Sequence, residues 1–270
     1  MTIGPDDATA FLALHAPGRP LLMPNPWDVG SARLLASLGF KALATTSGGY
    51  AAALGRLDYS VTRDEALAHG TAIAAAVEVP VSADLENCFA DDPAGVASTV
   101  QAAVEAGLTG CSVEDFTTRS DQPIYELGLA IERVEAAAEA AHTGSGFVLT
   151  ARAEGYLHGQ RDLAATIARL QAYGEAGADV LFAPGLTDLD EIRTVVTAVA
   201  RPVSVLALRG GPTVAELASA GVARISVGGS FAMVALGALA RAGNELLEHG
   251  TLGWTELASE GRKAAVRAFA

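Results

Sequence analysis

Alanine-rich amphipathic segments alternate with short apolar runs along most of the chain, and a glycine separates the two at four places. These boundaries read Leu38-Gly39-Phe40, Ala106-Gly107-Leu108, Ala176-Gly177-Ala178 and Ala220-Gly221-Val222. A glycine just past a helix supplies the left-handed residue that ends it. The repeated boundary therefore predicts alternating helices and strands, and hence a parallel sheet.

The apolar runs predict eight strands, at residues 21–24, 42–46, 81–84, 111–114, 147–152, 180–183, 203–206 and 224–227. The amphipathic segments predict helices at residues 29–38, 62–77, 92–106, 125–142, 161–176, 189–199 and 214–220, after a short helix that precedes Pro17. Eight parallel strands with intervening helices close into a (β/α)₈ barrel of the TIM type, in the α/β class. The 270 residues match one such domain, so residues 1–270 are expected to form a single barrel.

Two further helical stretches, 230–249 and 254–269, follow the last predicted strand. A barrel needs only one helix at that point. We therefore expect residues 230–270 to pack at a subunit interface in a homo-oligomer, a dimer or a tetramer.

The formal net charge of −13 argues against nucleic acid or an anionic membrane as a partner. No apolar run is long enough for a membrane span, and the first residues lack the features of a signal peptide. We expect a cytoplasmic protein that acts on a small molecule. The two cysteines, Cys88 and Cys111, form neither a metal-binding pattern nor a disulfide framework.

Three predicted strands end in charged residues, and the carboxyl ends of the strands form the catalytic face of a parallel barrel. Asp84 and Glu86 end the third strand on one side of it, and Glu114 ends the fourth. Carboxylates that converge there form a hard oxygen site suited to Mg²⁺, with Mn²⁺ as an alternative. A single carboxylate at such a place would more often cap a helix or pair with an arginine. Three of them favour a metal.

Arg152 ends the fifth strand and can grip a substrate carboxylate with two parallel hydrogen bonds. A salt bridge to Glu114 or Glu154 is an equally good interpretation, and substrate could switch the pairing. The loop at Ser47, Gly48 and Gly49 could offer backbone N–H groups to an anion, although a plain turn is the commoner reading. Arg209, after the seventh strand, is a candidate receptor for a distal carboxylate.

The remaining polar candidates carry weaker signals. Asp28 is as good a helix cap as a ligand. The five histidines mostly fall on predicted helix surfaces or loops, and only His158 is placed to reach the mouth of the barrel. Cys88 follows the acidic pair but is more typical of a small buried thiol. Asp179 precedes the sixth strand, on the opposite, stability face.

Several segments, taken in order, resemble the isocitrate lyase and phosphoenolpyruvate mutase superfamily, including its 2-methylisocitrate lyase-like and carboxyphosphonoenolpyruvate mutase-like members. The resemblance covers nearly the whole chain. It rests on residues 25–33 (NPWDVGSAR), 39–49 (GFKALATTSGG), Asp58, Asp84-Leu85-Glu86, Glu114-Asp115, Ala151-Arg152-Ala153-Glu154 and Gly177-Ala178-Asp179.

This resemblance implies a barrel whose last helix is exchanged between subunits, usually of a tetramer. It implies Mg²⁺ held by Asp84, Glu86 and Glu114, mostly through water. It also implies a 2-oxo carboxylate bound by the metal, by Arg152 and by the backbone around Thr46 to Gly49, with Asp58 close by. Family members form an enolate of a 2-oxo acid by breaking a C–C or P–C bond.

The chain departs from this family pattern in the loop after the fourth strand. The lyases of the family carry a cysteine and a histidine there, and the phosphonate enzymes a lysine and an asparagine. Residues 116–123 read FTTRSDQP and contain none of these. Thr45 replaces a tyrosine of the lyases, and Asn87 replaces a glycine. Decarboxylation needs fewer proton-transfer groups than retro-aldol cleavage. The missing cysteine therefore favours a decarboxylase or an unusual lyase.

The leading hypothesis is a Mg²⁺-dependent lyase that cleaves a carbon–carbon bond of a small 2-oxo or 2-hydroxy di- or tricarboxylate through a metal-stabilised enolate. Asp84, Glu86 and Glu114 would hold the metal, and Arg152 would orient the carboxylate. Asp58 would transfer a proton or position a water. The alternatives are a phosphonopyruvate mutase or hydrolase, which acts on a P–C bond, and a non-catalytic protein that binds oxo acids.

Overall fold

Eight parallel strands form the centre of the molecule. The computed structural model describes residues 5–143 and 146–270. The strands are β1 (Leu21–Met23), β2 (Leu43–Ala44), β3 (Val81–Asp84), β4 (Gly110–Glu114), β5 (Val148–Arg152), β6 (Val180–Phe182), β7 (Val203–Leu206) and β8 (Arg224–Ser226). They follow the order β1-β8-β7-β6-β5-β4-β3-β2. Every predicted strand is present, some shorter than expected.

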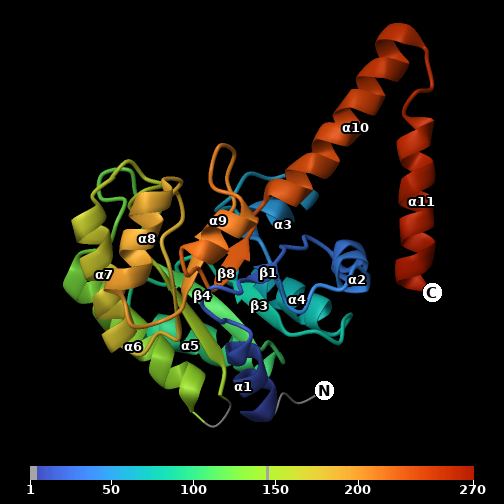
Figure 1. Ribbon diagram of the computed structural model, residues 1–270. Coiled ribbons are helices and arrows are strands. Elements are labelled where there is room, and N and C mark those ends of the chain that lie inside the picture. The colour runs from blue at the N-terminus through green and yellow to red at the C-terminus, as the bar shows by residue number, and fades with distance from the viewer. Residues whose placement is uncertain (1–4, 144–145) are drawn as a thin grey trace.

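Helices surround this sheet, as Figure 1 shows. They are α1 (Pro5–Ala13), α2 (Val29–Ser37), α3 (Ser47–Ala53), α4 (Arg63–Ala74), α5 (Pro93–Glu105), α6 (Leu127–His142), α7 (Leu163–Glu175), α8 (Leu189–Ala198), α9 (Val214–Ser219), α10 (Ser230–His249) and α11 (Thr255–Phe269). The four boundary glycines have φ values of +95°, +80°, +106° and +85° at Gly39, Gly107, Gly177 and Gly221, as the left-handed helix ends require. The (β/α)₈ prediction is confirmed.

The side chain of Asn25 links the two ends of the sheet. Beside it, the backbone N–H of Ala44 donates to the carbonyl of Pro24 at 3.1 Å, which connects β2 to the end of β1. The Asn25 Nδ2 donates to the carbonyl of Thr45, while its Oδ1 accepts from the N–H groups of Val227 and Gly228. One buried amide therefore joins the carboxyl ends of β1, β2 and β8.

Small aliphatic side chains fill the space between the strands and the helices. Leu43, Ile73, Leu108, Leu149 and Leu181 are at most 1% exposed and belong to one continuous apolar cluster. Alanine and valine supply most of the remaining contacts, which explains how a chain with only 6% aromatic residues builds a large core. The rigid frame that results holds the strand ends in place.

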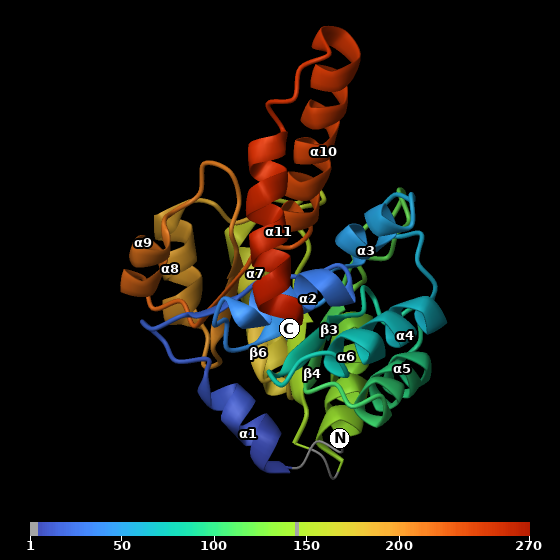
Figure 2. The ribbon, with the colours of Figure 1, turned by 90° about the vertical axis from the view of Figure 1, so that its right-hand side faces the viewer.

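Helices α10 and α11 form an arm that leaves the barrel and turns back on itself (Figures 1 and 2). The end of α11 packs against α2. The arm exposes large apolar side chains that a single chain leaves uncovered, among them Val234 (66%), Leu239 (69%), Leu247 (86%) and Val266 (68%). In the part of the chain that the structure describes, no helix has both the length and the apolarity that a membrane crossing requires.

The structure corrects two expectations about local structure. The Ser47–Gly49 segment is not a loop or a plain turn but the first turn of α3, with Thr46 as its N-cap. His15 and His69 are not surface residues but are buried, at 3% and 9% exposure. The His69 ring stacks on Tyr50, and the His15 Nδ1 lies 3.1 Å from the Phe11 carbonyl. Helix periodicity did not reveal these inward-facing histidines.

The buried His15 generates a pH prediction. Burial, and then the positive charge of Arg224, lower the pKa of His15 to about 3. The unfolded chain therefore takes up a proton near pH 6.5 that the folded chain refuses until about pH 3, so stability falls as the pH drops through this window. Between pH 7.5 and pH 4.5 the loss amounts to about 2–3 kcal/mol. In urea unfolding, His15→Asn should lose less stability than wild type over this interval by that amount. The exposed His249→Asn should match wild type, and equal pH dependence in all three proteins would refute the account.

Candidate active site at the carboxyl ends of the strands

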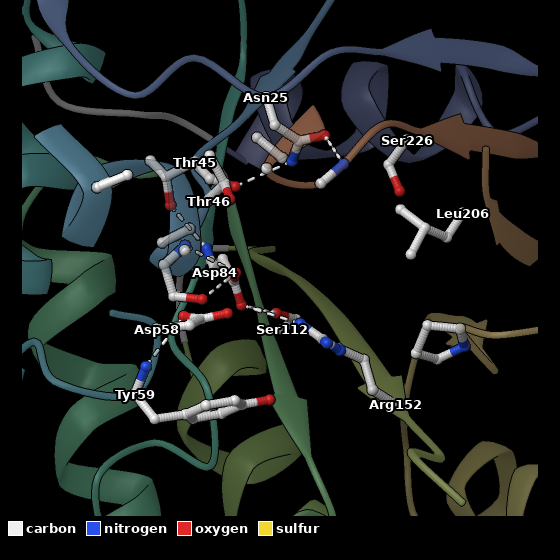
Figure 3. Close-up of a pocket in the computed structure, with 18 of the residues that line it drawn as sticks. Asn25, Thr45, Thr46, Asp58, Tyr59, Asp84, Ser112, Arg152, Leu206 and Ser226 are labelled. Atoms are coloured by element: carbon white, nitrogen blue, oxygen red, sulfur yellow. Dashed lines mark hydrogen bonds and ion pairs between the residues drawn. The ribbon is translucent and has the colours of Figure 1, made fainter. Parts of the chain in front are cut away.

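A cavity of about 590 Å³ opens at the carboxyl ends of the strands and continues into the barrel. Polar residues from six strands or their following loops line it: Asn25, Thr45, Thr46, Ser47, Asp58, Tyr59, Ser82, Asp84, Ser112, Arg152, Arg224 and Ser226. Figure 3 shows Asp58, Asp84 and Arg152 pointing toward one another across it. This is the face on which barrel enzymes place their catalytic groups.

Arg152 is the electrostatic centre of the site. Its Nη1 lies 3.0 Å from Asp84 Oδ1, its Nη2 3.1 Å from Glu114 Oε2, and its Nε 2.7 Å from Glu154 Oε1. The strand register makes this possible, because Glu114 of β4 lies directly opposite Arg152 of β5. The salt bridges expected as an alternative to substrate binding are present. One guanidinium thus faces three carboxylates, and a formal excess of negative charge remains.

Glu86 lies behind this group in a strained loop. Its φ of +50° is unusual for a residue with a side chain, and Cys88 and Phe89 share the left-handed conformation. Arg133 of α6 holds the loop through the carbonyls of Asn87, at 2.7 Å, and Asp91, at 2.9 Å. Burial, with the negative charges of Asp84 and Asp58, raises the pKa of Glu86 to about 8. A backbone conformation that is unfavourable for a residue with a side chain thus holds the Glu86 carboxyl group near other carboxylates.

The N-terminus of α3 faces the site. The Ser47 N–H and Oγ donate to Asp84 Oδ2 at 3.0 and 3.1 Å. A side chain at either of the next two positions would force a neighbour to shift, since a Cβ on Gly48 would lie 2.8 Å from Asp58 Oδ2, and one on Gly49 would lie 2.5 Å from Thr46 Cγ2. The first turn of α3 therefore approaches Asp84 through Ser47 and Asp58 through Gly48.

Asp58 and Tyr59 form a second wall of the cavity. Burial, and then the charge of Asp84, raise the pKa of Asp58. The Tyr59 ring meets Phe116 edge-on, with centroids 4.9 Å apart, and Phe116 stacks on His158 at 3.6 Å. Aromatic contacts thus join the segment after α3 to the loops after β4 and β5. The His158 ring packs against Phe116, but His158 is not among the described residues that line the cavity.

The donor set of Asp84, Glu86 and Glu114 fits a hydrated Mg²⁺. The buried Oε1 atoms of Glu86 and Glu114 find no hydrogen-bond partner among the described residues, and carboxylate oxygens are the ligands that Mg²⁺ prefers. No group of three or more described histidine, cysteine, aspartate or glutamate side chains already converges at metal-ligand spacing. Mg²⁺ usually keeps several of its waters, so such a site does not need three direct ligands. The metal set stays a prediction.

Of the other predicted site residues, only some lie at the cavity. Thr46 lines the cavity and caps α3 with its hydroxyl, which accepts from the Gly49 N–H at 3.2 Å. Arg209 is exposed after β7 and is absent from the described residues that line the cavity. Asp28 caps α2, and Asp179 accepts from the Leu149 N–H at the opposite end of the barrel.

The sequence analysis missed several polar residues of the cavity, namely Tyr59, Ser82, Ser112, Arg224 and Ser226. The only available signal for Arg224 was its place in a predicted strand, where its alternation with Ser226 indicates an inward side chain.

The model of the phosphoenolpyruvate phosphomutase family matches residues 11–247, which include the whole barrel and its site. The chain belongs to this family. It is therefore a member of the isocitrate lyase and phosphoenolpyruvate mutase superfamily, as the sequence motifs suggested, and its homologues are lyases and mutases.

Several known proteins of the superfamily are similar to this chain. A provisionally named lyase/mutase from Burkholderia cenocepacia J2315 is 53% identical, with a TM-score of 0.94 over 98% of this chain and 96% of that one. The 2-methylisocitrate lyase of Escherichia coli K12 is 30% identical over 71% of this chain and 70% of its own length. Oxaloacetate acetylhydrolase, solved with its product oxalate and with the inhibitor 3,3-difluorooxalacetate, is 25% identical, with a TM-score of 0.82, over 93% of this chain and 90% and 89% of those structures.

The ion pairs of Arg152 generate a stability prediction. Replacing Arg152 with Met leaves Asp84, Glu114 and Glu154 without their countercharge, and stranding buried carboxylates should cost about 3–5 kcal/mol of unfolding free energy. The matched control is Arg56→Met, which breaks the exposed pair with Glu65 and should cost less than about 1 kcal/mol. Urea unfolding of the three proteins at pH 7.5 measures both values. Similar small losses in the two variants would show that Arg152 does not hold the carboxylates together.

Proposed function

We propose that this protein is a Mg²⁺-dependent lyase that cleaves a carbon–carbon bond of a small 2-oxo or 2-hydroxy di- or tricarboxylate. The observation that carries the proposal is the pairing of Arg152 with three carboxylates beside one cavity, which Arg152, Asp84 and the N-terminus of α3 line. Cationic and N–H donors suit an oxo acid, while the surplus carboxylates suit a divalent cation.

Arg152 and the first turn of α3 are the groups that would bind and orient the substrate. The guanidinium can exchange one of its carboxylate partners for a substrate carboxylate without losing its overall pairing. The N-terminus of α3 borders the same space, where Ser47 and Gly48 line the cavity and the Ser47 N–H donates to Asp84 Oδ2. Thr46 fixes this turn through its hydroxyl.

Asp84, Glu86 and Glu114 would hold the cation, in part through water. When bound, Mg²⁺ supplies stabilisation of the negative charge that develops on an oxygen as the carbon–carbon bond breaks. The strained loop at Glu86 and the pairing of Glu114 with Arg152 keep these oxygens near the site in advance.

Asp58 and Tyr59 are the groups placed to handle protons. Cleavage leaves its electron pair as an enolate, and C3 must then accept a proton. The loop after β4 brings no thiol to the cavity, and the two cysteines are buried. The raised pKa of Asp58 favours a carboxyl group that holds a proton beside the substrate. A site with so few proton donors suits decarboxylation better than retro-aldol cleavage.

The names of the similar proteins support the same reaction class. They include a 2-methylisocitrate lyase and an oxaloacetate acetylhydrolase, and both names describe bond cleavage in small oxo or hydroxy acids. An oxaloacetate decarboxylase of Pseudomonas entomophila, 28% identical over 69% of this chain and 65% of its own length, belongs with them.

We also infer that a second copy of the chain covers the apolar arm of α10 and α11, as the superfamily resemblance implies. The exposed Val234, Leu239 and Leu247 would otherwise stay in water. A single-chain mass in sedimentation velocity at micromolar concentration would contradict this assembly.

The activity is tested by a ¹H NMR time course with Mg²⁺ and a pool of oxaloacetate, 2-methylisocitrate, isocitrate, dimethylmalate and phosphonopyruvate. We expect the enzyme to consume one of the four compounds other than phosphonopyruvate. The products that appear in the spectrum will identify the bond that is broken. Asp84→Asn keeps the shape of the side chain but loses its charge, and should lower the rate by about a hundredfold or more.

The matched control is Asp179→Asn, which removes a carboxylate at the opposite end of the barrel and should leave the rate unchanged. Phosphate release from phosphonopyruvate would replace the proposal with P–C cleavage. Turnover that persists in excess chelator would refute the role of the metal. No turnover of any compound, with oxo-acid binding intact, would favour a binding protein.

A further inference from the structure

The interior of the barrel below the carboxylates is unusually polar. Barrels of this type normally fill the interior with bulky branched side chains. Here the inward positions carry hydroxyl groups: Ser82, Ser112, Thr150, Ser204 and Ser226, all at most 9% exposed. Three of them, Ser82, Ser112 and Ser226, line the cavity, so the cavity extends downward instead of ending at Asp84.

Arg224 lies inside the barrel and lines this lower part of the cavity. It is 4% exposed, its Nε donates to Ser204 Oγ at 2.9 Å, and its Nη1 donates to Thr150 Oγ1 at 3.0 Å. No described residue accepts a hydrogen bond from its Nη2, and no described carboxylate forms an ion pair with it. Burying a guanidinium whose only hydrogen-bond partners are two hydroxyl groups costs desolvation free energy that these bonds do not recover.

The described titratable neighbours of Arg224 supply no negative charge to balance it. Burial, and then the positive charge of Arg152, lower the pKa of Arg224 to about 9, so the group is still a cation at neutral pH. His15 is its other titratable neighbour and is neutral there, since its pKa is about 3. The cavity therefore has two unlike ends, with excess carboxylates above and an unpaired cation below.

The spacing of the two ends suits a short diacid. Thr150, which accepts from Arg224, precedes Arg152 by two positions on β5, and two residues of a parallel strand span about 6.6 Å. A four-carbon dicarboxylate can bridge such a span with one carboxylate near Arg152 and the other near Arg224.

We propose that Arg224, with the hydroxyl groups of Thr150 and Ser204, is the receptor for the second carboxylate of the substrate. The proposal rests on the proposed function and narrows it to 2-oxo acids that carry a second carboxylate on a short chain. Monocarboxylate oxo acids leave the guanidinium unpaired and bind weakly. Arg209, exposed on its loop, is not needed for this contact.

Two ligands distinguish binding at Arg224 from binding at the upper site, the one formed by Arg152 and the carboxylates around it. Oxalate is too short to reach Arg224 and reports only on the upper site, while 3,3-difluorooxaloacetate carries a second carboxylate. Isothermal titration with Mg²⁺ present measures both affinities in wild type, Arg224→Gln and Arg56→Gln. Arg56 lines the mouth of the same cavity and is paired with Glu65, so its variant removes an equal charge from the other end.

We expect Arg224→Gln to lower the affinity for difluorooxaloacetate by about ten- to a hundredfold, because one charge-assisted contact is lost. The affinity for oxalate should change by less than about twofold. Arg56→Gln should bind both ligands as wild type does. Unchanged diacid affinity in Arg224→Gln, or a larger loss in Arg56→Gln, would overturn the assignment.

A second variant, Arg224→Met, tests whether Arg224 serves only to stabilise the fold. It removes a buried charge without a partner, so its melting temperature should not fall below that of wild type, and difluorooxaloacetate should no longer stabilise it more than oxalate does. A marked drop in melting temperature with equal loss of both ligands would make Arg224 a structural clamp and overturn the proposal. Failure of wild type to bind oxalate at all would instead refute the proposed function, and this inference with it.

Discussion

The pairing of Arg152 with Asp84, Glu114 and Glu154 is the interaction on which the site depends. The strand register places Glu114 of β4 directly opposite Arg152 of β5, while Asp84 of β3 lies opposite Ser112 and Glu154 follows β5. The long Arg152 side chain reaches all three carboxylates. Buried carboxylates in such proximity repel one another, and Arg152 is the charge that makes the cluster tolerable. Because one cation cannot balance three acids, the site remains attractive to a divalent ion. The same guanidinium can still bind an oxo acid.

The rest of the molecule supplies rigid support for this arrangement. Arg133 of α6 holds the left-handed loop that carries Glu86, and Asn25 joins the strands at the seam of the barrel. On the other side, Gly48 lets α3 approach Asp58, and Gly49 leaves space for Thr46 and Trp27. None of these contacts performs chemistry. They determine where the carboxylates, N–H groups and proton donors lie.

Much of the fold and the upper site could be predicted from the sequence, because both depend on local patterns. The boundary glycines and apolar runs predict the barrel, and charged residues at strand ends mark the catalytic face. The sequence could not show that Ser47 begins a helix, because a Ser-Gly-Gly segment has low helix propensity and only the cap by Thr46 and its packing stabilise it. Nor could it show which arginine lacks a partner. The sequence puts Arg209 in a loop and Arg224 in a predicted strand, but only the structure shows that Arg209 is exposed and that Arg224 lies inside the barrel without an acidic partner among the described residues.

The most direct test of the central claim is the dependence of oxalate binding on Mg²⁺, measured by isothermal titration of the wild-type protein in the presence of the metal and in excess chelator. If the carboxylates around Arg152 form a metal and oxo-acid site, oxalate should bind with Mg²⁺ and lose at least about a hundredfold in affinity without it. Equal affinity in both conditions would contradict this account. Arg152 and the backbone of α3 would then form an anion site that needs no metal.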